Sequence, residues 1–168
     1  MTRWTSSAPP EPRPDDHVRG EGLLDIEYAD LECPYCARAD KLLDGLPLTR
    51  VFRHFPVTSK HPRARRLAHA AEAAGLQGAF WEMHDSLFAD QGRLDDPHLW
   101  ERSRALGIDL ERFEADRRSG AVEERVGRDF RSGIRAGVTS TPTLFVDGEL
   151  HAGVPGPELL AHLGGQGV

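Results

Sequence analysis

The chain has 168 residues, of which 39% are hydrophobic and 29% are charged, and its formal net charge is −6 at pH 7. This length accommodates one domain with a hydrophobic core and an inserted subdomain. The acidic balance argues against nucleic acid as a partner, because binding through counterion release needs a basic surface. No stretch approaches the roughly 20 apolar residues that a helix needs to cross a bilayer, so we expect no membrane segment.

Residues 1–17 are rich in proline, serine and charged side chains, which predicts a flexible, loosely attached arm. The first 20 residues contain no apolar run of the length that a signal peptide needs. If Met1 is the native start, we therefore expect a cytoplasmic protein, in which neighbouring cysteines are more often catalytic than structural. Arginine outnumbers lysine 19 to 2, which is typical of bacteria with GC-rich genomes.

The two cysteines of the chain form the motif Cys33-Pro34-Tyr35-Cys36. An apolar, β-rich run at residues 22–30 precedes the motif and predicts a buried strand. A helical pattern at residues 34–45, closed by a glycine, follows it. The motif is therefore expected at a helix N-terminus, where unpaired N–H groups and the helix dipole stabilise a thiolate. C-x-x-C in such a β–α unit is typical of a thioredoxin-like redox motif.

Two other interpretations of this motif stay open. C-x-x-C is also half of a zinc site, and the eight histidines leave a Cys2His2 site conceivable, although they are scattered singly without ligand spacing. Alternatively, the two cysteines are incidental thiols. We expect a redox role without a bound metal.

The rest of the chain predicts a second strand, a series of helices, a hairpin and a last helix. Residues 50–56 form the second strand. Asp147-Gly148 lies between apolar runs within residues 143–151, which is a strong hairpin signal. Residues 157–164 form a short helix with proline at its first position. Between the second strand and the hairpin, helices are expected at residues 62–75, 78–89, 97–107, 110–118 and 121–137.

This order of elements predicts an α/β fold of the thioredoxin-like type, with a central mixed sheet flanked by helices and an inserted all-helical subdomain. We place the thioredoxin-like domain at residues 18–59 and 137–168, and the helical subdomain at residues 60–136. Within that subdomain we expect Asp109 to cap a helix. We also expect a buried apolar stripe at four-residue spacing, made of Val122, Val126, Phe130 and Ile134.

A second informative stretch is Thr139-Ser140-Thr141-Pro142-Thr143, which directly precedes the hairpin. A cis bond before proline costs only about 0.5–1 kcal/mol over trans and usually marks a tight turn. Proline at this strand start leaves neighbouring backbone groups unpaired, so that an extended peptide could bond to them by β-augmentation. The alternative is an ordinary trans proline that opens an edge strand.

Together, these stretches resemble the DsbA-like family of thioredoxin-fold thiol-disulfide oxidoreductases. The resemblance covers about residues 18–164, and the helical insertion is its specific part. It implies that the Thr141–Pro142 bond is cis and that both residues pack against the disulfide and hold substrate backbone. The matching stretches are residues 27–36, 52–56, 70–74 and 137–148.

By the same resemblance, Cys33 is the exposed nucleophile, Cys36 is the more buried resolving thiol, and Glu27 supplies a buried carboxylate beneath the pair. A buried carboxyl has a raised pKa and could carry the proton of Cys36. The alternative for Glu27 is a surface-facing side chain on an edge strand. Glu32, next to Cys33, is expected to oppose thiolate formation if it is ionised and close.

The chain departs from the secreted oxidants of the family at Tyr35, where those proteins carry histidine. A tyrosine offers a thiolate at most one hydroxyl hydrogen bond, whereas a histidine can also be charged. We therefore expect the pKa of Cys33 above the acidic end of the C-x-x-C range, and a milder oxidant. Pro34-Tyr35 is also the glutaredoxin dipeptide, but glutaredoxins are shorter and lack the insertion. Both residues, with Thr141 and Pro142, are the expected substrate contacts.

The predicted function is thiol-disulfide exchange with a thiol- or disulfide-containing substrate protein through a mixed disulfide. It needs no cofactor beyond the redox-active Cys33–Cys36 pair. Glutathione or a thioredoxin-type protein is the expected electron partner, and cytoplasmic residence favours reduction or isomerisation. The basic run at residues 60–66 either attracts an acidic substrate or is a solvated helix face.

Two rival functions stay open at this stage. One is a glutathione-dependent transferase or isomerase on the same inserted fold, although such relatives tend to have serine where Cys33 stands. The other is a redox-sensing binding module that reports the oxidation of its C-x-x-C pair to a partner.

Overall fold

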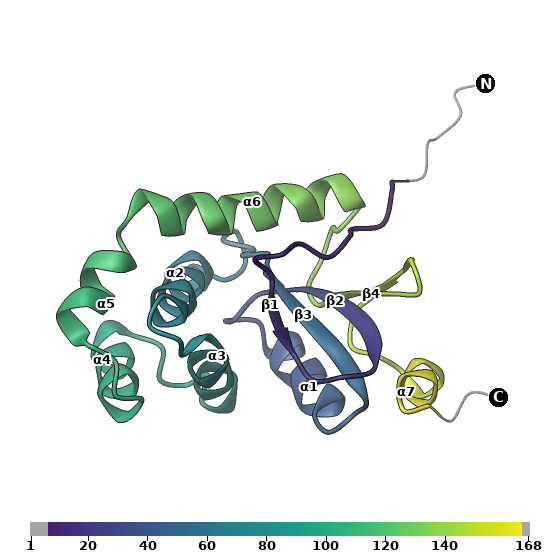
Figure 1. Ribbon diagram of the computed structural model, residues 1–168, viewed down its shortest axis with the longest axis horizontal. Coiled ribbons are helices and arrows are strands. Elements are labelled where there is room, and N and C mark those ends of the chain that lie inside the picture. Colours follow the sequence, from purple (N-terminus) through teal and green to yellow (C-terminus); the bar gives the residue numbers. More distant parts are fainter. Residues whose placement is uncertain (1–6, 166–168) are drawn as a thin grey trace.

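The computed structural model describes residues 7–165 and contains one five-stranded sheet (Figure 1). The strand order is β1-β3-β2-β4-β5. The β2–β3 pair is parallel and the other three pairs are antiparallel, so the predicted mixed sheet is confirmed. The strands are β1 (His17–Arg19), β2 (Leu23–Ala29), β3 (Leu48–His54), β4 (Thr143–Val146) and β5 (Glu149–Ala152).

Seven helices accompany the sheet in the described part of the chain, in the predicted order. Five of them, α2 to α6, lie between β3 and β4 in the sequence, and Asp109 caps α5 by accepting a hydrogen bond from the Arg112 amide, as predicted. None of the described helices is long and apolar enough to cross a membrane. The helices are α1 (Pro34–Leu43), α2 (Ala64–Gly75), α3 (Phe80–Ala89), α4 (Asp96–Ala105), α5 (Leu110–Asp116), α6 (Gly120–Ala136) and α7 (Pro157–Leu163).

Strand β2 lies at the centre of the sheet, and its alternating side chains serve two cores. Ile26 and Tyr28 pack with Phe55 and with the end of α6, which runs along the top of Figure 1. On the other face, Glu27 contacts Arg50, whose guanidinium also binds Asp40 of α1. The strand therefore presents an apolar face to α6 and carboxyl groups to the helix that begins at the C-x-x-C motif.

The helical insertion and the sheet share a hydrophobic core. One cluster of buried residues joins Ala29 of β2, Phe52 of β3 and both cysteines to the alanine-rich α2 and to Leu87 of α3. The predicted boundary at residue 60 separates the sheet from the helical insertion in the sequence. In the structure, side chains from both sides of this boundary pack into the same core. The insertion consequently forms one wall around the cysteines.

The segment before β1 is not the loosely attached arm that the sequence predicts. Arg53 of β3 is buried and donates to the carbonyl oxygen of Glu11 and to both carboxylate oxygens of Asp16. His17 belongs to β1, a strand too short for its periodicity to be recognised, and pairs with Phe52. The prediction is therefore wrong for residues 11–17, while residues 1–6 lie outside the described part, as do residues 166–168 at the other end.

The apolar stripe of α6 ends earlier than its spacing predicts. Val122 and Val126 are buried and Phe130 packs against the sheet, but Ile134 is 55% exposed. A four-residue step turns a helix by about 40° beyond one full turn, so three such steps carry the stripe off the buried face. Gly133 faces the sheet there instead.

We predict that Gly133→Ala destabilises the protein, whereas Gly127→Ala in the same helix does not. A Cβ at position 133 would lie 2.7 Å from Phe55 Cδ2 and 2.9 Å from Tyr28 Cδ1, and such overpacking costs about 1–3 kcal/mol. A Cβ at position 127 would lie 3.0 Å from Nη1 at the exposed end of the Arg131 side chain, which can shift, so removing the glycine contributes about 0.5–1 kcal/mol of stability. Denaturant unfolding measures both. Equal stabilities would contradict the close contact between α6 and the sheet.

Candidate active site at the start of helix α1

The C-x-x-C motif lies where the sequence places it, between β2 and α1. Cys33 is the N-cap residue of α1 and Pro34 is its first helical residue. The backbone amide of Cys33 donates to the carbonyl oxygen of Asp30 at 3.0 Å, and its carbonyl oxygen accepts from the Ala37 amide at 3.2 Å. This turn directs the Cys33 sulfur into the positive end of the helix dipole.

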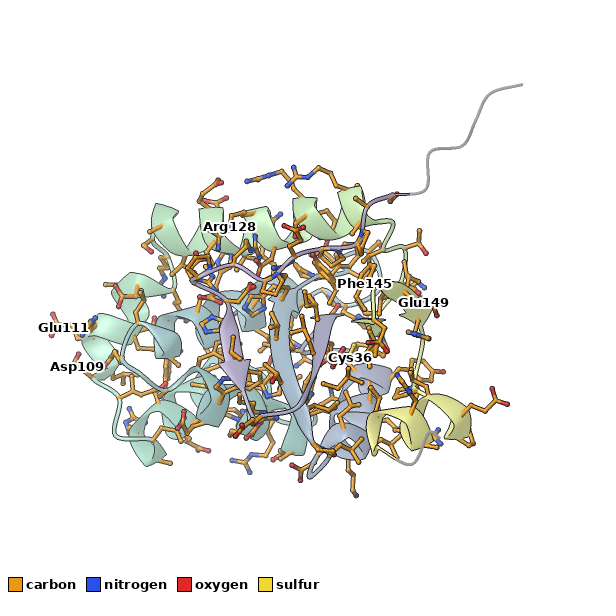
Figure 2. All side chains as sticks on the ribbon, turned by 45° about the vertical axis from the view of Figure 1, so that its right-hand side comes forward. Cys36, Asp109, Glu111, Arg128, Phe145 and Glu149 are labelled. Carbon is orange, nitrogen blue, oxygen red and sulfur yellow. The ribbon has the colours of Figure 1, made fainter. Side chains whose placement is uncertain are left out.

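Both cysteines are free thiols and both are buried, with Cys33 2% exposed and Cys36 0% exposed. Figure 2 shows Cys36 on α1, close to the sheet. The expectation that Cys33 is exposed is wrong, because the segment before β4 covers its sulfur. Tyr35 is 64% exposed and Pro34 is also exposed, so this dipeptide is the accessible part of the motif.

The segment that covers Cys33 contains the predicted cis bond, between Thr141 and Pro142. The Cys33 thiol donates to the carbonyl oxygen of Thr141, with a distance of 3.8 Å between sulfur and oxygen. Pro142 is buried and its own carbonyl oxygen accepts from the Gly153 amide at 2.8 Å. Thr143 then pairs with Tyr28 of β2. The sheet therefore holds Thr141 against Cys33, and the cis conformation is confirmed.

The two thiols have opposite electrostatic environments. The pKa of Cys33 is lowered from 9.0 to about 6, chiefly because its sulfur receives a hydrogen bond from the Cys36 thiol, with further bonds from the Cys36 and Tyr35 amides and the Thr141 side chain. Burial raises the pKa of Cys36 well above 9.0. Cys33 is thus the thiol that ionises first, and its pKa lies above the acidic end of the C-x-x-C range, as expected.

Glu27 is buried, at 1% exposure, so the alternative of a surface-facing side chain is wrong. Its Oε2 forms an ion pair with Arg50 at 3.1 Å, and its Oε1 has no hydrogen-bond partner. The charge of Glu27 is one of the groups that raise the pKa of Cys36. The carboxylate therefore lies within electrostatic reach of the thiol that ionises last.

A second acid, not predicted from the sequence, lies on the same strand. Asp25 is fully buried and neither of its carboxylate oxygens has a hydrogen-bond partner. Burial, together with the charge of Glu27, raises the pKa of Asp25 well above 3.8. An aspartate two residues before Glu27, on the same face of a strand predicted to be buried, was the signal that could have identified it.

Side chains from the helical insertion fix the turn that carries Cys33. Glu32 accepts from the backbone amide of Arg63 at 2.7 Å and from its Nε at 3.0 Å. The side-chain amide of Gln91 donates to the carbonyl oxygens of Leu31 and Cys33 at 3.2 and 3.1 Å. The Glu32 charge is paired with Arg63, so it opposes a thiolate less than expected. Neither contact follows from sequence spacing, because 31 and 58 residues separate the partners.

Within the described residues, one group of three side chains has the spacing of metal ligands, and it contains neither cysteine. It consists of Asp40, His84 and Asp85. The guanidinium of Arg19 binds both carboxylates, at 3.3 Å from Asp40 and 2.8 Å from Asp85. A positive charge of the protein itself therefore already pairs with both carboxylates of this group.

Two thiols at a helix start, closed by a cis-proline segment of a mixed sheet, define the class of thioredoxin-fold proteins with a C-x-x-C pair. The family model described as DSBA-like thioredoxin domain matches residues 45–163. The chain therefore belongs to the DSBA-like thioredoxin domain family. The matched region begins after Cys36, so the assignment of the dithiol itself comes from the geometry described above.

Solved structures of similar fold include a thioredoxin-like oxidoreductase from Silicibacter pomeroyi DSS-3, with a TM-score of 0.80 and 25% identity over 92% of each chain. The thiol-disulfide exchange protein alpha-DsbA2 from Wolbachia pipientis has a TM-score of 0.78 and 18% identity over 91% of this chain and 87% of that one. DsbA2 from Pseudomonas aeruginosa has a TM-score of 0.71 and 26% identity, covering 91% and 94%.

Curated relatives carry a different name. A protein named Na(+)/H(+) antiporter NhaA 1, from Salinispora arenicola, is 46% identical over 82% of this chain and 22% of its own length. The protein of the same name from Mycolicibacterium vanbaalenii is 42% identical over 91% of this chain and 28% of its own length. The chain thus spans about a quarter of the length of these relatives.

We predict that the Cys33 thiolate forms with a midpoint near pH 6, visible as ultraviolet thiolate absorbance of the reduced protein and lost in Cys33→Ser. Folding lowers this pKa from 9.0, so the group stabilises the reduced fold fully above about pH 9. Its contribution disappears as the pH falls through about 6. Denaturation of both proteins across this range measures the contribution. A midpoint near 9 would contradict the assigned environment of Cys33.

Proposed function

We propose that the protein is a thiol-disulfide oxidoreductase in which Cys33 is the nucleophile and Cys36 the resolving thiol. The observation that carries the proposal is the difference between the two thiols, since the pKa of Cys33 falls to about 6 while that of Cys36 rises. Only a thiolate attacks a disulfide, and near neutral pH Cys33 is the thiol that supplies it. Membership of the DSBA-like family supports the same reaction class.

In the reducing direction, the Cys33 thiolate attacks one sulfur of a substrate disulfide. The Cys33–substrate bond forms, the substrate disulfide breaks, and the departing substrate sulfur takes a proton. Cys36 then loses its proton and attacks the Cys33 sulfur, which closes the Cys33–Cys36 disulfide and releases the second substrate thiol. Two electrons pass from the dithiol to the substrate. A thiol partner such as glutathione or a thioredoxin-type protein then supplies two electrons that reduce the Cys33–Cys36 disulfide again. The oxidising direction is the reverse sequence.

Glu27 takes the proton of Cys36 in this cycle. Its buried position, the unpartnered Oε1 and its electrostatic influence on Cys36 support this role. The ion pair with Arg50 holds the carboxylate in place from the neighbouring strand. A general base in this position contributes most near neutral pH, where the Cys36 thiol does not ionise by itself.

The substrate binds across Tyr35 and the cis-proline segment. Tyr35 and Pro34 are exposed next to the covered sulfur, and Thr141 is partly exposed on the opposite side. An extended substrate protein can lie along the backbone of residues 139–141 as an added strand. Tyr35 supplies aromatic area for an apolar side chain of that substrate.

A second candidate concerns the partner. Relatives 40–46% identical to this chain are named Na(+)/H(+) antiporters, and this chain matches about a quarter of their length. We therefore propose a cation antiporter as one protein with which the C-x-x-C pair exchanges disulfides. The geometry favours neither of the two rival functions. A glutathione-dependent transferase or isomerase does not need Cys36, and a redox sensor does not need a resolving thiol with its own base.

We predict that Cys33→Ser abolishes the reduction of a generic protein disulfide by dithiothreitol, because the attacking thiolate is removed. Cys36→Ser, its matched variant, should accumulate a mixed disulfide through Cys33, visible by non-reducing electrophoresis. When this mixed disulfide is isolated from cells, the identity of the trapped protein shows whether a cation antiporter is a partner. Activity that persists in Cys33→Ser would overturn the assignment, and a wild type that lacks turnover but oxidises stoichiometrically would favour the sensor.

We further predict that Glu27→Gln slows the closure of the Cys33–Cys36 disulfide at least about tenfold at neutral pH, because the amide cannot take a proton. Single-turnover kinetics of a preformed mixed disulfide measure this step. Glu72→Gln is the control: Glu72 is a buried glutamate bound to His17 and His54, and its loss should reduce stability without slowing closure. An unchanged or faster closure in Glu27→Gln would contradict the role as base.

A further inference from the structure

Asp30 is the first residue after β2, three positions before Cys33. It contacts both cysteines through its backbone. Its amide donates to the Cys36 sulfur, with a distance of 3.4 Å between nitrogen and sulfur. Its carbonyl oxygen accepts from the Cys33 amide at 3.0 Å. The residue is 1% exposed, so no water competes for these contacts. The amide of Asp30 is therefore a fixed hydrogen-bond donor aimed at the resolving sulfur.

The carboxylate of Asp30 fixes the orientation of this backbone. Oδ1 accepts from the Glu32 amide at 2.9 Å, within the same turn. Oδ2 accepts from the Val57 amide and from His61 Nδ1, both at 2.9 Å and both in the connection between β3 and α2. One buried carboxylate thus joins the C-x-x-C turn to a segment more than 25 residues away in the chain.

These three donors depend on the carboxylate for their partner. An apolar side chain at position 30 would leave the partly buried N–H groups of Glu32 and Val57 without this acceptor, which costs stability. The turn would relax to satisfy them elsewhere, and the Asp30 amide would turn away from the sulfur. The hydrogen bond to the Cys36 sulfur therefore depends on a side chain that touches neither cysteine.

We propose that Asp30 is a positioning residue, whose buried carboxylate holds its own backbone amide on the Cys36 sulfur and so stabilises the Cys36 thiolate. This inference rests on the proposed function, since it concerns the step in which Cys36 closes the disulfide. The same amide stabilises Cys36 as the leaving thiolate when a substrate thiol attacks the Cys33 sulfur of the oxidised protein.

The charge of Asp30 would act in the opposite sense. A negative group near Cys36 disfavours its thiolate, as Glu27 of β2 does, and the ionised Cys33 on α1 adds to this effect. His61 binds the far oxygen of Asp30 from the β3–α2 connection. If the hydrogen bond from the Asp30 amide is the larger effect, removal of the carboxylate raises the pKa of Cys36. If the negative charge of the carboxylate is the larger effect, its removal lowers that pKa. The sign of the change therefore decides between the two effects.

The test compares Asp30→Ala and Asp30→Asn in a Cys33→Ser background, where Cys36 is the remaining thiol. The rate of Cys36 alkylation is measured against pH. We expect Asp30→Ala to raise the Cys36 pKa by about one unit, which is a tenfold lower thiolate fraction at a given pH. Asparagine keeps one acceptor oxygen, so a smaller rise in the same direction is expected, and this variant serves if the alanine variant does not fold.

The matched control is Asp129→Asn. Asp129 is another fully buried aspartate that accepts a backbone amide, that of His54, together with Arg13, and neither partner contacts a cysteine. It should reduce stability but leave the Cys36 pH profile unchanged. An unchanged or lowered Cys36 pKa in the Asp30 variants overturns the proposal, as does an equal shift in the control. Because alkylation needs no turnover, the result stands apart from the test of activity in Cys33→Ser.

Discussion

The structure depends on one electrostatic constraint, the stabilisation of a sulfur anion at the N-terminus of α1. Cys33 reaches a pKa of about 6 although it is 2% exposed, and burial by itself would raise that value. Hydrogen-bond donors must therefore replace the lost water, and the helix start, the Cys36 thiol and the Thr141 side chain supply them. The rest of the fold keeps these donors in place around the sulfur.

Three parts of the chain converge on this turn. The sheet places the cis-proline segment against Cys33 by pairing β4 with β2. The helical insertion holds the turn from the other side through Arg63 and Gln91. Beneath it, Asp30 connects the turn to the segment after β3. Each of these contacts restricts the movement of the turn. The two sulfurs are therefore held in the positions that the proposed disulfide exchange needs.

The sequence predicted the order of the elements because those signals are local, whereas the cis-proline segment beside Cys33 was expected from the resemblance to the DsbA-like family. Hydrophobic periodicity, the Asp147-Gly148 turn and the C-x-x-C spacing each depend on neighbouring residues. The anchoring of residues 11–17 on Arg53 and the contacts of Gln91 and Asp30 join distant segments, so no periodicity announces them. The exposure of Cys33, which the resemblance implies, is wrong because the carbonyl oxygen of Thr141 lies 3.8 Å from its sulfur and the residue is buried.

The pairing of Cys33 with Cys36 is measured by equilibrating the reduced protein in glutathione buffers of stepped potential, followed by acid quenching and thiol mapping. We expect one two-electron transition that joins Cys33 to Cys36, at a potential more reducing than the roughly −120 mV of the strongest oxidants of this kind. Thiols that never pair with each other, or that only form separate mixed disulfides with glutathione, would contradict it.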